Sequence, residues 1–527
     1  MITDRARWRD AGLLAAAFLL IGLVVYGRSL GNAFVEWDDH LLITANPIVT
    51  DPSWAMLWRA FTTYDPELYI PLTFVSYQLT TLAAGVQPWA FHFGNLLLHV
   101  INALLVAWTA FLLLPKSSSR FPIPAFVVGL LFLLHPLHTE AVAWASARKD
   151  VLSVLFSLAS TVAFLQYRST QRTAFYAASL GLFLAALLSK VTPLLLPAVY
   201  LLIDWMHRRP ITRRTLAEIA PFVLASVVFF AVAVWGKEGG GALLTDKLLL
   251  GAKATVFYLG KLVIPTGLSV LYPYTKPIGI LTPDLLLSLA AIVTMTIALV
   301  ILGARNAVRW PLAAWAAYLL LLAPTFGTVA KGHNELLDAY FASDRYAYLP
   351  SVAAFLAAGG GIALLERWKR SIGVAAFVVI ACGFAVLAYR QSLVWRDTET
   401  LFRHTARHYP NAYVAHTNLG VILVRRGDVN GGLEEFRKAL EIREDATTLY
   451  NVGQILRAQG KRQLAMIAFA RALRASPLET DAAVALATML REDGKIPEAR
   501  QIIREALENV PGHEELLRLQ SEIMPAG

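Results

Sequence analysis

The chain has 527 residues, of which 57% are hydrophobic and 16% charged, whereas a soluble protein carries roughly 25% charged residues. This composition excludes an ordinary soluble globule and predicts that most of the chain faces lipid. The formal net charge of +10 does not indicate a nucleic-acid-binding protein, because the excess lies in short loops between apolar blocks.

Apolar blocks of about 16 to 24 residues predict an all-α, polytopic membrane helix bundle of about eleven spans. The first block, near residues 11 to 28, follows Arg5, Arg7 and Arg9 and lacks a small-residue cleavage site. We therefore expect it to be a retained anchor rather than a signal peptide. The other spans are expected near residues 91–114, 122–137, 151–167, 174–189, 191–205, 215–236, 281–304, 309–330, 349–365 and 372–391.

The loops between these spans differ in charge. Alternate loops are basic, whereas the long segment from residue 31 to 90 holds only Arg59 as a basic residue. The positive-inside rule then predicts a cytoplasmic N-terminus and places the long first loop on the outer side. Lysines interrupt the apolar runs of residues 239–277, which we expect to be interfacial or re-entrant.

The tail after residue 391 has the composition of soluble helices and contains a repeat of about 33 or 34 residues. Small and bulky residues recur in register at Leu419-Gly420, Val452-Gly453, Leu486-Ala487, Gly432, Ala465, Ala499, Phe436, Phe469, Ile503, Ala439, Ala472 and Ala506. Small residues let paired helices approach, which is typical of the tetratricopeptide repeat (TPR). We predict a membrane domain at residues 1–391 and an outer TPR α-solenoid at residues 392–527.

An acidic pair, Asp38 and Asp39, follows the first span in FVEWDDHLLITANP. Carboxylates at a membrane surface are costly, so the pair marks a candidate site. One of them is a candidate base for an acceptor hydroxyl, because partial desolvation raises the pKa of a carboxylate toward that role. The alternative is that one caps the short helix that follows, and the choice of base stays open.

A second polar cluster, in LLHPLHTEAVAWASARKD, begins where the third span is expected to reach the same face. It supplies His135, His138, Glu140, Arg148 and Asp150. Imidazole and carboxylate groups can hold a metal, but this spacing is not an HExxH pattern. Hydrogen bonding to a sugar or phosphate is therefore the favoured interpretation; no metal site is assigned, and a divalent ion is left as an alternative.

A third cluster, in KGHNELLDAYFASDRYAYLPS, precedes the tenth span and contains Lys331 and Arg345. A guanidinium binds phosphate oxygens by paired hydrogen bonds, so Arg345 is a candidate for a lipid-linked phosphate, with Lys331 as a second cation. We expect Tyr346 and Tyr348 to belong to the interfacial aromatic belt.

Polar residues also lie along one stripe of the second span. His92 is near its outer end and is expected to reach the site, whereas His99 and Asn102 are expected to hold helices together.

The stretches EWDDHLLITANPIV, YIPLTFVSYQL, FHFGNLLLHVINALL, HPLHTEAVAWASARKDVLS, SDRYAYLPS and WRDTETLFRHTARHYPNAYVAHTNLG resemble the transmembrane and tetratricopeptide repeat-containing family. This family is a group of protein O-mannosyltransferases with the membrane fold called GT-C. The resemblance implies a GT-C-like bundle, and the basic loops fit a bacterial member.

The resemblance implies an inverting glycosyltransferase that moves mannose or another hexose from a polyprenyl-phosphate donor to a protein or glycan hydroxyl. Asp38 or Asp39 would be the base, and Arg345 would lie near the donor phosphate. In this picture the donor's lipid tail stays in the bilayer and its phosphate and sugar lie beneath the first loop. The repeats would hold a protein or peptide acceptor, or a partner.

Two other classes of function are weighed against this one. A lipid-linked sugar transporter or flippase commonly shows inverted repeats, which this sequence does not display. A membrane-anchored TPR scaffold needs only one or two spans. The expected location is a bacterial inner membrane with periplasmic repeats, or the endoplasmic reticulum membrane with lumenal repeats in a eukaryote.

Overall fold

The computed structural model describes residues 4–64, 68–114, 123–236, 243–306, 308–328, 330–331, 338–365 and 370–523. The chain forms two compact units, Met1–Leu401 and Phe402–Gly527. The expected domain boundary at residue 391 falls inside α16 (Arg370–Val394), the last long helix of the first unit.

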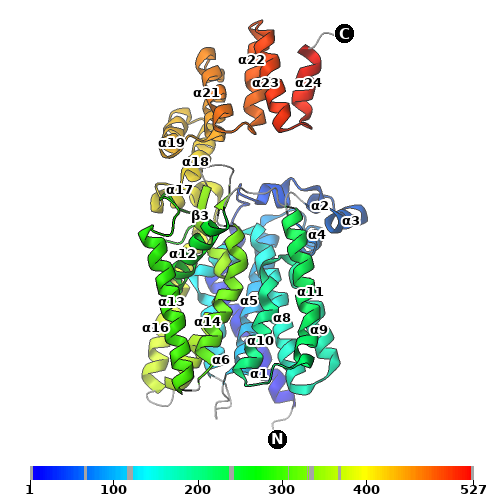
Figure 1. Ribbon diagram of the computed structural model, residues 1–527, viewed down its shortest axis with the longest axis vertical. Coiled ribbons are helices and arrows are strands. Elements are labelled where there is room, and N and C mark those ends of the chain that lie inside the picture. Colours follow the sequence, from blue (N-terminus) through cyan, green and yellow to red (C-terminus); the bar gives the residue numbers. More distant parts are fainter. Residues whose placement is uncertain are drawn as a thin grey trace. The chain divides into compact units, whose positions relative to one another are not determined.

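The first unit is built from long apolar helices (Figure 1). Its helices of 20 or more residues are α1 (Asp4–Tyr26), α5 (Pro88–Leu113), α8 (Arg148–Thr170), α11 (Arg213–Trp235), α12 (Leu244–Val263), α13 (Pro283–Asn306) and α16. Shorter ones are α6 (Ile123–Leu134), α9 (Thr173–Ser189), α10 (Leu196–Met206), α14 (Trp310–Leu322) and α15 (Ser351–Leu365).

Among the described residues, six helices are long and apolar enough to cross a membrane, or seven if a bent pair is counted as one span. Four shorter apolar helices occupy other predicted spans: Thr173–Ser189, Thr192–Met206, Trp310–Phe326 and Ser351–Ile362. The apolar blocks of the sequence therefore predicted the helical membrane architecture correctly, and the chain is a multi-pass membrane protein.

The third predicted span is broken rather than straight. Helix α6 ends before His135, and the chain continues through η3 (Pro136–His138) and α7 (Thr139–Ala143) at an angle of 52°. Pro136 lacks the N–H that a continuing helix needs, which explains the break. After the bend, the segment from residue 136 to 143 packs against α5, α16 and the residues Asp344–Ala347.

A small antiparallel sheet was not predicted by the sequence. Its strands are β1 (Tyr272–Pro273), β2 (Ala330–Lys331) and β3 (Asp338–Ala342), in the order β1-β3-β2. Two of the strands have only two residues, too few to show an alternating pattern. Helix α12 occupies much of the segment expected to be interfacial or re-entrant and carries Lys247, Lys253 and Lys261.

The first loop folds into short helices at one end of the bundle, which we call the loop end. These are η1 (Gly27–Gly31), η2 (His40–Thr44), α2 (Pro47–Thr50), α3 (Trp54–Thr62) and α4 (Pro71–Ala84). Figure 1 shows α2, α3 and β3 at this end and the start of α1 at the opposite end. The side chains of Asn46 and Ser53 cap α2 and α3 by accepting backbone N–H bonds, which fixes where each helix begins.

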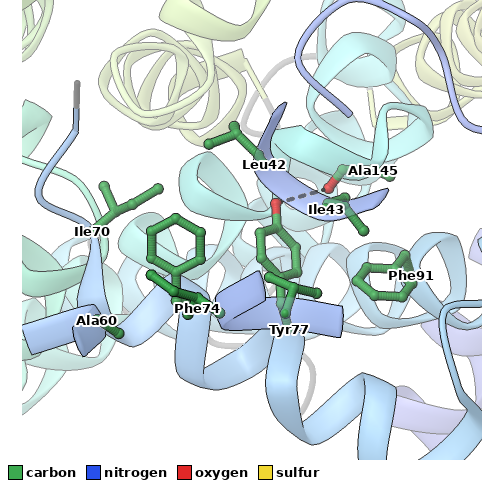
Figure 2. Packing of buried hydrophobic residues seen from close by; sticks show 10 residues of the cluster. Leu42, Ile43, Ala60, Ile70, Phe74, Tyr77, Phe91 and Ala145 are labelled. Atoms are coloured by element: carbon green, nitrogen blue, oxygen red, sulfur yellow. Dashed lines mark hydrogen bonds between the residues drawn. The ribbon is translucent and has the colours of Figure 1, made fainter. Parts of the chain in front are cut away.

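A hydrophobic cluster holds the first loop on the bundle. Leu42, Ile43 and Phe74 are buried with Tyr77 against Phe91 of α5 (Figure 2). The Tyr77 hydroxyl donates a hydrogen bond to the backbone oxygen of Ala145 at 3.3 Å. The loop is therefore joined to the residues just before α8 as well as to α5.

The second unit consists of paired helices, as the repeat predicts. After α17 (Thr398–His408), the pairs are α18 (Tyr413–Arg425) with α19 (Val429–Ile442), α20 (Ala446–Ala458) with α21 (Arg462–Ala475) and α22 (Thr480–Glu492) with α23 (Ile496–Asn509), followed by α24 (Glu514–Ile523). This confirms the predicted TPR solenoid.

A close approach between helices explains the small residue of each repeat. A Cβ atom added at Gly420 would lie 2.5 Å from the Phe436 ring, and one added at Gly453 would lie 2.5 Å from the Phe469 ring. The third repeat has Ala487, and its opposite residue is the smaller Ile503 in the same buried cluster. The small-residue position therefore requires glycine where the opposite residue is phenylalanine, whereas alanine fits where the opposite residue is isoleucine.

We expect Gly453→Ala to destabilise the second repeat by about 1–3 kcal/mol, because the new methyl group overpacks the Phe469 ring. Adding Phe469→Ile should restore part of the loss by reproducing the third repeat. Hydrogen exchange of the α20 and α21 amides in the full chain measures both effects. Gly512→Ala is the control, because no atom lies within 4 Å of a Cβ built there; equal protection in Gly453→Ala and this control would refute the packing explanation.

Candidate functional site

The two aspartates of the first loop have different environments. Asp39 is fully buried. Its Oδ2 accepts from the backbone N of Val35 at 2.8 Å, and its Oδ1 accepts from the backbone N and the hydroxyl of Ser146 at 2.9 and 2.5 Å. Asp39 precedes η2 but makes no side-chain cap bond to it. Its carboxylate instead ties the first loop to the segment that begins α8.

Burial changes the acidity of this carboxyl group. Desolvation raises the pKa of Asp39 from 3.8 to about 6, although the hydrogen bonds from Ser146 and Val35 act in the opposite direction. Asp39 thus titrates close to physiological pH while being shielded from solvent.

Asp38 is more accessible, with 37% of its side chain exposed. Its Oδ2 lies 3.3 Å from Nζ of Lys149, whose side chain is only 6% exposed. The adjacent carboxylates therefore have separate positions, one at the surface of the site and one beneath it.

Two further ion pairs lie near Asp38. Lys190 pairs with Asp150, and Arg345 pairs with Glu140. Electrostatic interactions join the pairs, because Lys149 interacts with Lys190, Arg345 and Asp150 as well as with Asp38. We call these six residues the ion-pair cluster: Asp38, Glu140, Lys149, Asp150, Lys190 and Arg345.

Aromatic rings hold the cations of the cluster. Nζ of Lys149 lies 5.3 Å and Cζ of Arg345 lies 5.0 Å from the centroid of the Trp144 ring. Trp144 stacks on Trp395 at 5.6 Å. Tyr346 lies 4.9 Å from Cζ of Arg345 and 5.5 Å from Nζ of Lys190. Such cation–π contacts fix flexible basic side chains in place.

Arg345 is held by polar groups on several sides. Besides Glu140, its guanidinium donates to the Ser343 hydroxyl at 2.8 Å and to the Tyr346 hydroxyl at 3.4 Å. The neighbouring Asp344 accepts a 2.6 Å hydrogen bond from Tyr272 of β1. Burial raises the pKa of Asp344 well above its ordinary value, and the charge of Glu140 adds to this effect. The small sheet therefore positions the segment that carries Arg345.

The candidate histidines take part in internal hydrogen bonds. His138 bonds to the backbone oxygen of Phe132 at 2.7 Å and to the hydroxyl of Ser351 at 2.9 Å. His135 accepts from the backbone N of Leu137 and bonds to the backbone oxygen of Leu262, both at 3.2 Å. Both rings are fully buried. These contacts join α6, α12 and α15 and use both nitrogens of each ring.

The remaining candidate residues are Arg148, His92 and Lys331. Arg148 donates to Asn95, Thr80 and the backbone oxygen of Phe91 at 2.6, 3.1 and 2.7 Å. It therefore binds α4 and α5 to the start of α8. His92 is buried in α5 and 1% exposed. The side chain of Lys331 lies outside the described residues.

Asp38, Glu140 and Arg345, which the sequence analysis singled out, all lie in the ion-pair cluster, whereas Lys149 and Lys190 were not singled out. Both lysines lie at the boundary of an apolar block, and this position could have marked them as candidate site residues in the sequence. Within the part of the chain that the structure describes, no group of three or more His, Cys, Asp or Glu residues is arranged to hold a metal ion.

The titration of Asp39 leads to a prediction about stability. Its pKa is higher in the folded chain than the ordinary 3.8, so the folded state binds the proton more tightly. Loss of the Asp39 proton therefore lowers the free energy of unfolding by at most about 3 kcal/mol as pH rises from about 4 to about 6. Above that range the effect of Asp39 on the free energy of unfolding is constant. Asp39→Asn keeps an oxygen for Ser146 and should remove this slope.

Thermal unfolding between pH 4 and 7 checks the prediction by the difference between the native chain and Asp39→Asn. Asp51→Asn, at an exposed carboxylate of the same loop, is the control. A native pH profile parallel to that of Asp39→Asn would show that Asp39 does not titrate in this range.

Known proteins resemble both units. A tetratricopeptide repeat model matches residues 450–514. Human protein O-mannosyl-transferase TMTC1 is 36% identical over 176 residues, which are 31% of this chain and 19% of that protein. Human protein O-mannosyl-transferase TMTC2 is 30% identical over 158 residues, 29% of this chain and 18% of that protein.

A longer match comes from the Caenorhabditis elegans protein O-mannosyl-transferase F38B6.6, which is 24% identical over 461 residues, 84% of this chain and 64% of that protein. The chain matches only about a fifth of the length of the human relatives. The crystal structure of the APC/C hetero-tetramer Cut9-Hcn1 aligns with 92% of this chain and all of that chain at 11% identity, but its TM-score of 0.26 is too low for an argument about the fold.

Proposed function

We propose that this chain is a membrane glycosyltransferase that moves mannose or another hexose from a polyprenyl-phosphate donor to a hydroxyl group of a protein or glycan. The observation that carries the proposal is the ion-pair cluster, in which the partly exposed Asp38 pairs with Lys149, and Lys149 interacts electrostatically with two further cations, Lys190 and Arg345. The printed names of the relatives, protein O-mannosyl-transferases, support the same reaction class.

The proposed reaction is a single inverting displacement. The acceptor oxygen forms a bond to the anomeric carbon of the sugar while the bond from that carbon to the phosphate oxygen breaks. The bonding electrons leave with the polyprenyl phosphate, and the hydroxyl proton passes to a carboxylate base. Cations near the leaving phosphate stabilise its developing charge.

Asp38 fits the base better than Asp39. Its side chain is 37% exposed, whereas both oxygens of Asp39 already accept internal hydrogen bonds. Lys149 orients the Asp38 carboxylate, and Arg345 and Lys190 are the proposed phosphate contacts. Trp144 contacts Lys149 and Arg345, and Tyr346 contacts Arg345 and Lys190, so the two rings help to hold these cations in place. The proposed chemistry needs no nucleotide, and we assign no metal.

We further propose that the reaction takes place on the extracytoplasmic side of the membrane. The loop end lies at the end of the first unit away from the start of α1 (Figure 1). The basic loops between spans favour a cytoplasmic location for that start. A TPR surface commonly binds other proteins, so the second unit would hold a protein acceptor or a partner.

The test is sugar transfer in membranes from a radiolabelled polyprenyl-phosphate mannose to secreted-protein acceptors. Asp38→Asn should reduce the transfer rate by about 100-fold or more, the usual contribution of a general base, while the chain inserts and folds normally. Asp51→Asn is a matched control, because it removes an exposed carboxylate of the same loop.

Two results would contradict the proposal. Unchanged transfer in Asp38→Asn would exclude this residue as the base. No transfer by the native chain across a panel of lipid-linked hexoses would refute the glycosyltransferase itself; partner binding by the repeats would then indicate a scaffold, and movement of the lipid-linked sugar between leaflets would indicate a transporter.

A further inference from the structure

Some polar atoms of the ion-pair cluster and of the adjoining Trp144 are buried without a hydrogen-bond partner among the described residues. They are Oδ2 of Asp150, Nε of Arg345 and Nε1 of Trp144. Buried polar groups in proteins are normally paired, because an unpaired group loses its hydration without compensation. The carboxylate oxygen accepts hydrogen bonds and the two nitrogens donate them, so the set is suited to a ligand that has both a hydroxyl group and acceptor oxygens.

Asp150 lies in the first turn of α8, and its side chain is only 6% exposed. Acidic residues are favourable in a first turn because they interact with the helix dipole, but an aspartate with only that role is normally exposed. Here Oδ1 pairs with Lys190, which directly follows α9. This ion pair joins the two helices and leaves Oδ2 without a partner among the described residues. Helix packing therefore accounts for only one of the two carboxylate oxygens.

The charges around Asp150 restrict what Oδ2 can bind. Lys149 and Lys190 already supply positive charge beside the carboxylate, which disfavours a further cation. An anion such as phosphate is repelled by the carboxylate itself. A hydroxyl group is neutral and donates a hydrogen bond, and a bond to an ionised acceptor is stronger than one between neutral groups. The environment of Oδ2 therefore favours a hydroxyl group as its partner.

The neighbours of Asp150 relate this hydroxyl group to the glycosyl donor. Lys190, one of the proposed phosphate contacts, pairs with Asp150, and Arg345, the other, interacts with it electrostatically. The sugar of a glycosyl phosphate is attached directly to the phosphate, so its hydroxyl groups lie close to the phosphate contacts. We propose that Asp150 recognises one hydroxyl group of the donor hexose through Oδ2, while Lys190 holds the carboxylate through Oδ1. This assignment rests on the proposed function and adds a specificity-determining residue to it.

A single available oxygen leads to selectivity at a single position of the sugar ring. Because Oδ1 is engaged by Lys190, the carboxylate has one oxygen left for the ligand. A site that binds a substrate hydroxyl discriminates strongly against the analogue that lacks it, since the buried polar group then stays unpaired. Loss of Asp150 should therefore abolish discrimination at one hydroxyl position and leave discrimination at the other positions unchanged.

The test measures equilibrium binding of radiolabelled polyprenyl-phosphate hexoses to the full chain in lipid nanodiscs, without an acceptor. The hexose that binds most tightly among mannose, glucose and galactose is compared with each of its monodeoxy analogues. We expect one analogue to bind the native chain roughly 10- to 100-fold more weakly, the usual effect of losing a hydrogen bond to a charged group. In Asp150→Ala this analogue and the parent hexose should bind equally.

Ser153→Ala is the matched control for packing. The Ser153 hydroxyl also joins α8 to the end of α9, because it bonds to the backbone oxygens of Ala186 and Lys190 at 3.0 and 3.2 Å. Weaker packing alone would change the affinity of every analogue by the same factor, so this variant should keep the native discrimination. Asp150→Asn keeps the side-chain shape and an oxygen for Lys190 but lacks the charge. It provides a conservative variant in which discrimination at the same position should fall, because a neutral acceptor binds a hydroxyl more weakly.

The possible outcomes separate this inference from the proposed function. Equal discrimination by the native chain and Asp150→Ala would overturn the sugar contact, even if the chain transfers sugar. Binding of every hexose no tighter than that of polyprenyl phosphate without sugar would overturn it as well. Discrimination that depends on Asp150 in a chain without transfer activity would retain the sugar site and refute the enzyme.

Discussion

A buried carboxylate saturated by hydrogen bonds is the constraint on which the loop end depends. Asp39 accepts from Val35 on its own loop and from both the backbone and the hydroxyl of Ser146, so it fixes the distance between the first loop and the start of α8. That connection determines where Asp38 lies relative to Lys149. A residue without contact to the proposed substrate thus sets the geometry of the residues that would contact it.

The pattern of apolar blocks was sufficient to predict the membrane helices, because a bilayer demands a long apolar stretch from each span. The repeat was also evident in the sequence, because the close approach of Gly420 to the Phe436 ring restricts that position to a small residue. The bend after α6 and the small sheet were not predicted. Each depends on contacts between segments far apart in the chain, such as Tyr272 with Asp344, which local periodicity does not record.

The candidate site was predictable in part. Charged residues next to apolar blocks identified Asp38, Glu140 and Arg345, because such residues are costly at a membrane. Sequence alone did not separate them from Arg148, which is also charged, lies in the same stretch and binds Asn95 inside the bundle. Two neighbouring residues on a helix point in different directions, so Arg148 and Lys149 reach different partners. Only the packing of α8 decides which of the two faces the cluster.

The pairing of every cation in the ion-pair cluster has a consequence for ligand exchange. Lys149, Lys190 and Arg345 each have a carboxylate neighbour, so the cluster is close to neutral without a substrate. The carboxylates hold the cations in position and offset the electrostatic repulsion between them. In the proposed reaction, the donor phosphate would replace a carboxylate as the partner of a cation, so that two anions would compete for one cation. Under this proposal, selectivity for a phosphate over weaker anions would depend on the strength of the ion pair that the phosphate must break.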